Sequence, residues 1–479
     1  MSLPEKQPQG RHIFRLVRTS ALASAILLAA CETEPPVVRP QPRPLGRDLV
    51  MPPSLEKAPP STSDDKNVAL QSFEAPAGEL TLQRALAQAL VGSPELAAFS
   101  YDIRAAEART MQAEFIPNPV VGVDSQDFGG SGTRRGFDGA QTTLSFNQLI
   151  ELGSKREKRV RSARLDESLA AWDYETKRLD TLLETTRAFI GLLTAQRKLE
   201  LAESILALDR QVHTTVDERV RAGRVSPLEE RRAQVALANA TVSVDRARRE
   251  VTAARDRLTM QWGGKTANFD RAIGNLAEVS APRPLAELLS LAAQNPDLAR
   301  WATEVDSREA KVSVERSKDI PDPTLSAGVR RYGEDRSNAF IAGISIPIPV
   351  FGLNRGNVLD AQERLAKGRA EQRAAEARIT AAVRQGFEKL SSAFEEVNSL
   401  NRDILPAATT AFEGAGEGYR RGKFALIDVL DSQRSLTEAQ GRLVDAMAEY
   451  QIARAEMERL TGQSMTSPHQ PTQARTGEK

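Results

Sequence analysis

The chain has 479 residues, with 65 Lys and Arg against 64 Asp and Glu and a formal net charge of +1. This balance provides no long-range positive field and argues against a nucleic-acid partner. The single cysteine excludes an internal disulfide. The mean hydropathy is -0.40, and no apolar run approaches the ~20 residues of a membrane-spanning helix, which argues against an α-helical membrane protein.

The first 30 residues have the pattern of a secretory signal, with arginines before an apolar stretch. The stretch ends in "LAAC", which resembles the lipobox of bacterial lipoproteins. The resemblance implies that Cys31 becomes an acylated N-terminus, and Glu32, in place of Asp, favours export to the outer membrane. The alternative is a buried free cysteine behind an ordinary signal, since free cysteines are commonly buried.

Residues 31–79 are expected to form an acylated cysteine followed by a tether, because nine prolines and few large apolar residues lie between Glu32 and Pro60. The tail, residues 463–479, is polar and is predicted to be disordered. Neither segment can bury a core.

Between these segments the sequence repeats itself at a distance of roughly 200 residues. "IPNPVVGV" at Ile116 matches "IPDPTLSAGV" at Ile320, and "VRAGRVSPLEE" around Gly223 matches "YRRGKFALIDV" around Gly422. The matches occur in the same order, which indicates a duplicated unit.

The two copies are predicted at residues 80–262 and 285–462, joined by a connection at 263–284. Each copy has the pattern helix, strand pair, long helix, break, long helix. A helix from Ser154 to Arg221 would be ~100 Å long at 1.5 Å per residue.

The last helix has the clearest heptad pattern. Its two apolar positions repeat every seven residues and predict a coiled-coil seam: Val429, Leu436, Leu443, Tyr450 and Met457 at one, and Ser432, Ala439, Ala446, Ala453 and Leu460 at the other. Leu228, Val235 and Val242 give the same spacing in the first copy.

Strand pairs are predicted near 119–150 and 323–350. In the first, Leu144, Phe146 and Ile150 fall on one face; in the second, alternate residues from Phe340 to Val350 are apolar. Strands of about 9–11 residues with this alternation are typical of β-strands that cross a bilayer at a tilt. A half-buried hairpin of a soluble protein is the alternative.

Four strands cannot close a barrel, for which about eight are needed, and open sheet edges are not tolerated in hydrocarbon. If the strands cross a membrane, several chains must therefore share one barrel, and three chains would supply twelve strands.

The duplicated unit, the lipobox and the helix breaks resemble the TolC-type outer membrane factors of tripartite efflux systems. "GYRRGKFALIDVLDSQRSLTEAQ" resembles their second helix-turn-helix, and "QLIELGSKREKRV" and "ISIPIPVFGLNRGNV" resemble the cobalt-zinc-cadmium resistance branch.

The resemblance implies a mainly α fold with a small β part. It implies a homotrimer in the outer membrane that is lipid-anchored, forms a shared twelve-stranded barrel, and continues as a coiled-coil helical barrel into the periplasm. It also implies three kinds of partner besides outer membrane lipid and further copies of the chain: a periplasmic adaptor (membrane fusion) protein, an inner membrane pump of the resistance-nodulation-division type, and the exported heavy-metal cations such as cobalt, zinc or cadmium.

The resemblance also implies a gate. Asp428 and Asp431 match the family's pore constriction; their i, i+3 spacing places both on one helix face, and carboxylate rings favour cations. Tyr419 and Glu229 match a latch that closes the gate, whereas a basic member of that latch has no counterpart near Phe424.

The two breaks match the helical tips that contact the adaptor, where glycine allows a tight reversal. The candidate contact residues are Gly223, Arg224, Val225 and Ser226 in the first tip, and Gly422, Lys423 and Phe424 in the second.

The sequence has no nucleophile elbow or phosphate loop, so we expect no enzyme and no cofactor. The three histidines are His12, His213 and His469; no pair has zinc-ligand spacing, and no metal site is predicted. His213 is expected on a helix surface. Two alternatives stay open: an outer membrane factor for organic compounds or drugs, and a lipid-anchored periplasmic coiled-coil protein.

Overall fold

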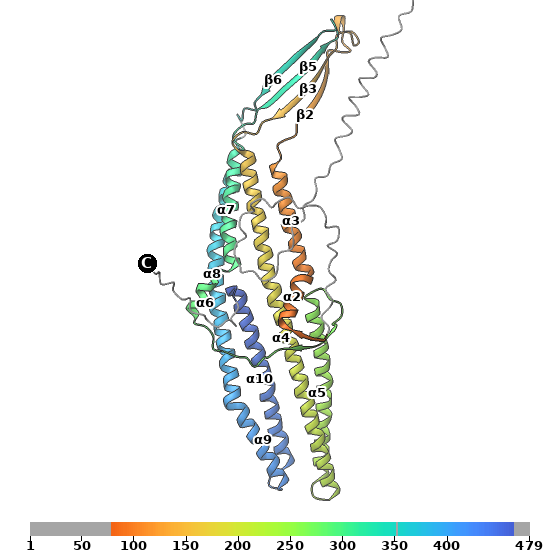
Figure 1. The fold of residues 1–479 in the computed structure, drawn as a ribbon, viewed down its shortest axis with the longest axis vertical. Coiled ribbons are helices and arrows are strands. Elements are labelled where there is room, and N and C mark those ends of the chain that lie inside the picture. The colour runs from red at the N-terminus through yellow and green to blue at the C-terminus, as the bar shows by residue number, and fades with distance from the viewer. Residues whose placement is uncertain (1–77, 351–352, 464–479) are drawn as a thin grey trace, which may run out of the picture. The chain divides into compact units, whose positions relative to one another are not determined.

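The computed structural model describes residues 78–350 and 353–463 (Figure 1). Cys31, His12 and His469, with most of the predicted tether and the tail, lie outside these residues. Within the described part of the chain, no helix is both long enough and apolar enough to cross a membrane.

The first repeat contains a helix, a strand pair, a 67-residue helix and a returning helix, as its sequence predicts. Its elements are β1 (Gly78–Thr81), α2 (Leu82–Gly92), α3 (Pro94–Glu114), β2 (Val120–Gln126), the 3-10 turn η1 (Gly132–Arg134), β3 (Gln141–Leu149), α4 (Lys155–Arg221) and α5 (Pro227–Met260). The connection adds β4 (Phe269–Ile273), which pairs with β1 in parallel.

The second repeat has the same order but a broken long helix. Its elements are α6 (Leu285–Ala292), α7 (Pro296–Ser317), β5 (Thr324–Tyr332), β6 (Asn338–Ser345), α8 (Arg355–Ser399), the π-helical turn η2 (Leu400–Ile404), α9 (Leu405–Arg420) and α10 (Leu426–Thr461). Pro406 has no N–H to donate to the carbonyl four residues earlier, and the π-helical turn lies directly before α9, of which Pro406 is the second residue. The matching part of α4 is continuous helix.

Equivalent helices of the two repeats begin in the same way. The side chain of Ser93 accepts a hydrogen bond from the Leu96 N–H at the start of α3, and the side chain of Asn295 accepts one from the Asp297 N–H at the start of α7. A proline follows each cap at the first helical position, where its missing N–H costs nothing.

The strand pairs join into one antiparallel sheet with the order β2-β3-β5-β6. Its register places apolar residues of all four strands on one face, and their side chains are exposed: Val121, Val123, Leu144, Phe146, Leu325, Val329, Phe340 and Ile344. The opposite face is mainly polar; there Thr143 is buried and accepts a hydrogen bond from the Arg330 guanidinium at 2.9 Å. The sheet therefore presents a continuous apolar surface that nothing in the described part of the chain covers.

Two of the strands have the expected length of 9–11 residues and two are shorter: β3 and β5 have 9 residues, β6 has 8 and β2 has 7. The expected strand up to Val350 is wrong, because β6 ends at Ser345. Pro347 and Pro349 follow in the sequence and cannot donate to a strand ladder.

Below the sheet the helices continue its order. Contacts link α3 to α4, α4 to α7, and α7 to α8, so that four helices lie in a row as the four strands do (Figure 1). The row ends at α3 and α8, which lead into β2 and out of β6, the two edge strands.

The predicted seam of α10 is confirmed at six of its ten positions, where Val429, Tyr450, Met457, Ala439, Ala446 and Ala453 are buried. The other four, Ser432, Leu436, Leu443 and Leu460, are half-buried. The corresponding stripe of α5 is not covered within one chain. Leu228, Val235 and Val242 are 58%, 60% and 68% exposed, and α5 buries mainly small residues such as Ala233, Ala240 and Ala247.

Candidate gate at the helical tips

Two helical reversals, one in each repeat, form the candidate functional site. At the end of α4, the Gly223 N–H donates to the Val220 carbonyl and the Arg224 N–H to the Arg219 carbonyl, both at 2.9 Å. After α9, the N–H groups of Gly422 and Lys423 repeat this pattern, donating to Tyr419 and Gly418 at 3.0 and 2.8 Å.

These bonds define a Schellman motif, which requires a left-handed residue just past the helix end. Gly223 has φ +67° and Gly422 has φ +72°. The duplicated sequence has thus produced the same reversal twice.

The remaining predicted contact residues lie directly in these turns. Arg224, Lys423 and Phe424 are exposed and Val225 is half-buried. The hydroxyl of Ser226 accepts a hydrogen bond from the Leu228 N–H at 3.3 Å and begins α5.

Phe424 also packs inside its own turn. A Cβ atom added at Gly418 would lie 2.1 Å from the Phe424 ring, so only glycine fits beneath it. The second tip therefore has an aromatic side chain packed within its turn, whereas the first tip has no aromatic residue.

The two tips meet at Tyr419. Its hydroxyl donates a hydrogen bond to the Glu229 carboxylate at 2.9 Å, which joins α9 to α5. Burial raises the pKa of the Tyr419 phenol, and the neighbouring Glu229 carboxylate raises it further. The phenol therefore stays protonated, as a hydrogen-bond donor must.

Arg219 is the member of this site that the sequence did not reveal. Its guanidinium lies 4.7 Å from the centroid of the Tyr419 ring and donates to the Tyr419 carbonyl at 3.4 Å. The only signal was a basic residue in the last turn of α4, a common feature of helix ends. We call Arg219, Glu229 and Tyr419 the tip latch.

A small apolar cluster lies beneath the tip latch and holds the two hairpins together. Val216 of α4 and Ala233 of α5 pack with the residues from α9 and α10, which are Ala415, Tyr419, Leu426 and Val429. These contacts therefore lie over a core of only a few side chains.

Asp428 and Asp431 lie one turn apart at the start of α10, and both are exposed. The Asp428 carboxylate accepts a hydrogen bond from the Ala425 N–H at 2.9 Å, which caps the helix and suits the positive end of its dipole. Asp428 thus has a structural role within its own helix besides any role in a pore.

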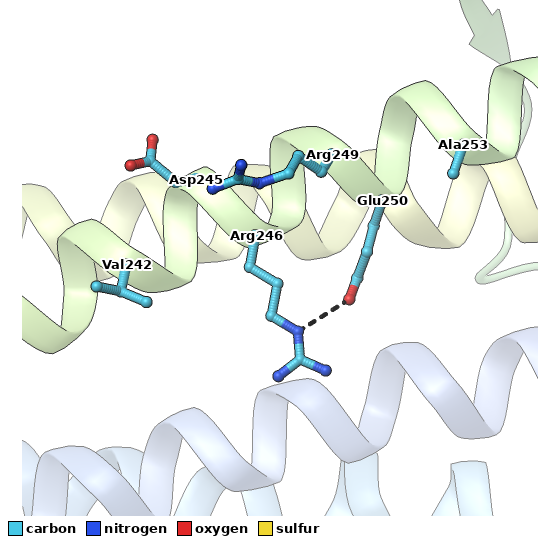
Figure 2. Close-up of a pocket in the computed structure, with 6 residues that line it drawn as sticks. All are labelled: Val242, Asp245, Arg246, Arg249, Glu250 and Ala253. Carbon is cyan, nitrogen blue, oxygen red and sulfur yellow. Dashed lines mark hydrogen bonds and ion pairs between the residues drawn. The ribbon is translucent and has the colours of Figure 1, made fainter.

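A shallow groove of about 540 Å³ lies along α5, lined by Val242, Asp245, Arg246, Arg249, Glu250 and Ala253 (Figure 2). Arg246 and Glu250, one turn apart on α5, form an ion pair at 3.3 Å. Its two carboxylates are matched by two guanidinium groups, so this groove does not favour a bound cation.

In the described part of the chain, no three His, Cys, Asp or Glu residues lie close enough together to hold a metal ion. His213 lies half-buried on α4.

A duplicated helix–hairpin–helix unit, with an apolar-faced four-stranded sheet and paired helical tips, defines the class of outer membrane channel subunits. The family model described as outer membrane efflux protein matches residues 85–264 and 288–463. The chain belongs to this family, and its two matched segments divide at the connection between the repeats.

Individual proteins similar to this chain include other proteins of this kind. The chain is 33% identical over 387 residues to the cobalt-zinc-cadmium resistance protein CzcC of Cupriavidus metallidurans, covering 81% of this chain and 91% of the relative. It is 28% identical to the nickel-cobalt-cadmium resistance protein NccC of Alcaligenes xylosoxydans xylosoxydans, covering 63% and 67%. The crystal structure of the CmeC outer membrane channel of Campylobacter jejuni has the same fold, with a TM-score of 0.67 at 15% identity, covering 86% of this chain and 94% of that one.

Proposed function

We propose that three copies of this chain form a passive outer membrane duct for heavy-metal cations. The observation that carries the proposal is the four-stranded sheet with an exposed apolar face and two unpaired edges. An apolar face suits lipid, but an open edge in hydrocarbon leaves backbone groups unsatisfied at a cost of several kcal/mol each. Edge β2 of one copy must therefore pair with edge β6 of the next.

The helices support the same assembly. The outer helices of the row carry exposed apolar side chains where a second copy would lie: Tyr101, Met111 and Phe115 on or just after α3, and Leu359 on α8. A head-to-tail contact of two different edges generates a ring when the rotation between copies closes. Three copies supply twelve strands, and the exposed stripe of α5 (Leu228, Val235 and Val242) would be covered in the same ring.

The cargo is proposed from the relatives. Two of them are named for resistance to cobalt, cadmium, zinc or nickel. The described residues offer no metal-binding cluster, so the duct would conduct ions that an inner membrane pump selects and an adaptor protein delivers at the tips. We propose that Asp428 and Asp431 face the constriction and that Cys31 carries the lipid anchor.

A growth assay tests the cargo. Deletion of this gene should lower the concentrations of zinc, cobalt or cadmium that the host tolerates, and expression of the chain should restore them. If the deletion sensitises the host only to organic compounds, the alternative of a drug-exporting duct replaces the metal proposal.

Planar bilayers test the duct and its gate. Purified protein should form channels, and Tyr419→Phe combined with Glu229→Ala should raise the open-to-closed ratio by about fivefold per chain, because each chain loses a hydrogen bond that closes the tips. Gln211→Ala, at an exposed position on α4, is the control and should leave gating unchanged. Channels with unaltered gating in the double variant would contradict the latch.

A further inference from the structure

A second contact joins the two hairpins above the tip latch. The Gln433 side-chain N–H of α10 donates to the Asp209 carboxylate of α4 at 2.7 Å. Asp209 is 5% exposed and Gln433 is 7% exposed, so both polar groups have been removed from water. Ten residues separate Asp209 from Arg219 along α4, which places this contact ~15 Å from the latch at 1.5 Å per residue.

The contact lies within apolar packing. On α4, Asp209 comes between Leu206 and Val216, which belong to two separate buried clusters. On α10, Gln433 follows Val429 by one helical turn. A polar pair at these positions interrupts an interface that is otherwise apolar.

This polar pair is incompletely satisfied. The carbonyl oxygen of the Gln433 side chain is buried and has no hydrogen-bond partner among the described residues. Asp209 has no Lys, Arg or His partner in an ion pair within the described part of the chain. A buried carboxylate with one amide donor, beside a carbonyl that has no donor, has a higher free energy than the same groups have in water.

We propose that Asp209 and Gln433 destabilise the closed state of the gate, so that the hairpins separate more readily once the tip latch opens. We call this pair the release point. This inference rests on the proposed function. When α10 moves away from α4, water reaches the carboxylate and the orphaned carbonyl, and both gain hydrogen bonds that the closed state denies them. The tip latch holds the gate closed, and the release point opposes it.

Asp209→Asn separates this inference from the simpler view that the hydrogen bond holds the gate closed. An asparagine is the same size, carries no charge, and can both accept from the Gln433 amide and donate to its orphaned carbonyl. The substitution should therefore lower the open-to-closed ratio by about fivefold per chain, the effect of one net hydrogen bond. On the simpler view, loss of a charged acceptor would raise this ratio.

Two further variants isolate the pair. Gln433→Glu places two carboxylates against each other and should raise the open-to-closed ratio. In a Gln433→Leu background, the Asp209 carboxylate loses its amide donor, so the open-to-closed ratio should rise, and Asp209→Asn should lower it again because it removes the buried charge. Gln211→Glu, at an exposed position on the same helix, should have no effect.

Single-channel recordings in planar bilayers give the ratio for each variant. A second measurement, by chemical labelling, does not depend on ionic current. A cysteine introduced at Val429, which is buried in the same interface, should react with maleimide more slowly in the Asp209→Asn variant and faster in the Gln433→Glu variant. Folding is checked independently by circular dichroism on each purified variant.

The possible failures are distinguishable. If the parent protein forms no channels, the proposed duct fails. If channels form and Asp209→Asn leaves both the open fraction and the labelling rate unchanged, or raises them, the release point is wrong and the duct stands.

Discussion

The waist and the tips of this molecule hold the same helix, α10, in different ways. We use waist for the region where the segment 274–297 contacts the upper part of α10. There the Tyr450 hydroxyl donates to the Ser280 carbonyl at 2.7 Å and accepts from its N–H at 3.1 Å, and the Gln451 side chain donates to two further carbonyls of the segment. The Asn295 amide donates to the last carbonyls of the helix.

At the tips, the contacts between hairpins are fewer. The hydrogen bonds there join Tyr419 to Glu229, Arg219 to the end of α9, and Gln433 to Asp209, over one small apolar cluster. One end of α10 is thus fixed by paired and satisfied groups, and the other by a few contacts of which one is incomplete. Such a helix is suited to move at one end only.

The largest effect is expected in the waist, at Arg459. Its guanidinium pairs with Asp180 at 2.8 Å and with Asp297 at 2.5 Å, and the side chain is only 14% exposed. Arg459→Met would leave both carboxylates without their cation. Because the Asp180 and Asp297 side chains are 43% and 28% exposed, we expect a loss of about 1.5–3 kcal/mol.

Thermal unfolding in detergent, followed by circular dichroism, measures this loss. Arg434→Met is the matched control on the same helix, because the Arg434 side chain is 80% exposed in its pair with Glu438 and such pairs contribute about 0–1 kcal/mol. Equal losses of stability in the two variants would mean that the ion pairs of the waist contribute no more than an exposed pair on the surface of α10.

Much of this arrangement follows from sequence patterns, because it is local. The two glycine reversals, the seam of α10 and the strand pairs each depend on residues within a few turns of one another. The π-helical turn has a visible cause in Pro406, although its form does not follow from the sequence alone.

Contacts between distant segments were not predictable in the same way. Gln433 stands out as a polar residue beside an apolar seam, but nothing in the sequence indicates that its partner is Asp209 on another helix. Arg219 likewise resembles an ordinary helix-end cation until α9 is placed beside it. For the stripe of α5, the heptad shows that a face is apolar but does not show which chain covers it.

The tip latch should respond to alkaline pH while the waist does not. Burial and the Glu229 carboxylate raise the pKa of Tyr419 above its ordinary value of about 10. A raised value in the closed state means that the latch is fully effective below pH ~10 and is lost as the pH rises through the shifted value. Arginine stays charged throughout this range, so the pairs of Arg459 persist.

Labelling of a cysteine at Val429 should therefore be constant between pH ~6 and ~9, after correction for the reactivity of a free thiol, and should accelerate above pH ~10. Tyr419→Phe should be fast at every pH and lack the alkaline step. An alkaline step that persists in the phenylalanine variant would assign it to another group.

The smallest effect concerns the helix that carries the latch. α9 contains Gly414, Gly416 and Gly418, whereas the last part of α4, its counterpart in the first hairpin, contains no glycine. A Cβ at Gly414 meets nothing within 4 Å, so Gly414→Ala should stabilise α9 by about 0.5–1 kcal/mol through its helix propensity. The same change at Gly418 should destabilise the tip, because its Cβ would collide with the Phe424 ring.

Hydrogen exchange of the α9 amides distinguishes the two substitutions: Gly414→Ala should slow exchange a few-fold and Gly418→Ala should accelerate it. If Gly414→Ala also accelerates exchange, a neighbouring copy packs closely against Gly414. The low stability of α9 is then a property of the isolated chain that assembly removes. If exchange slows as expected, the second hairpin is intrinsically the weaker of the two, and glycines in one copy of a duplicated unit are sufficient to make one hairpin the moving part.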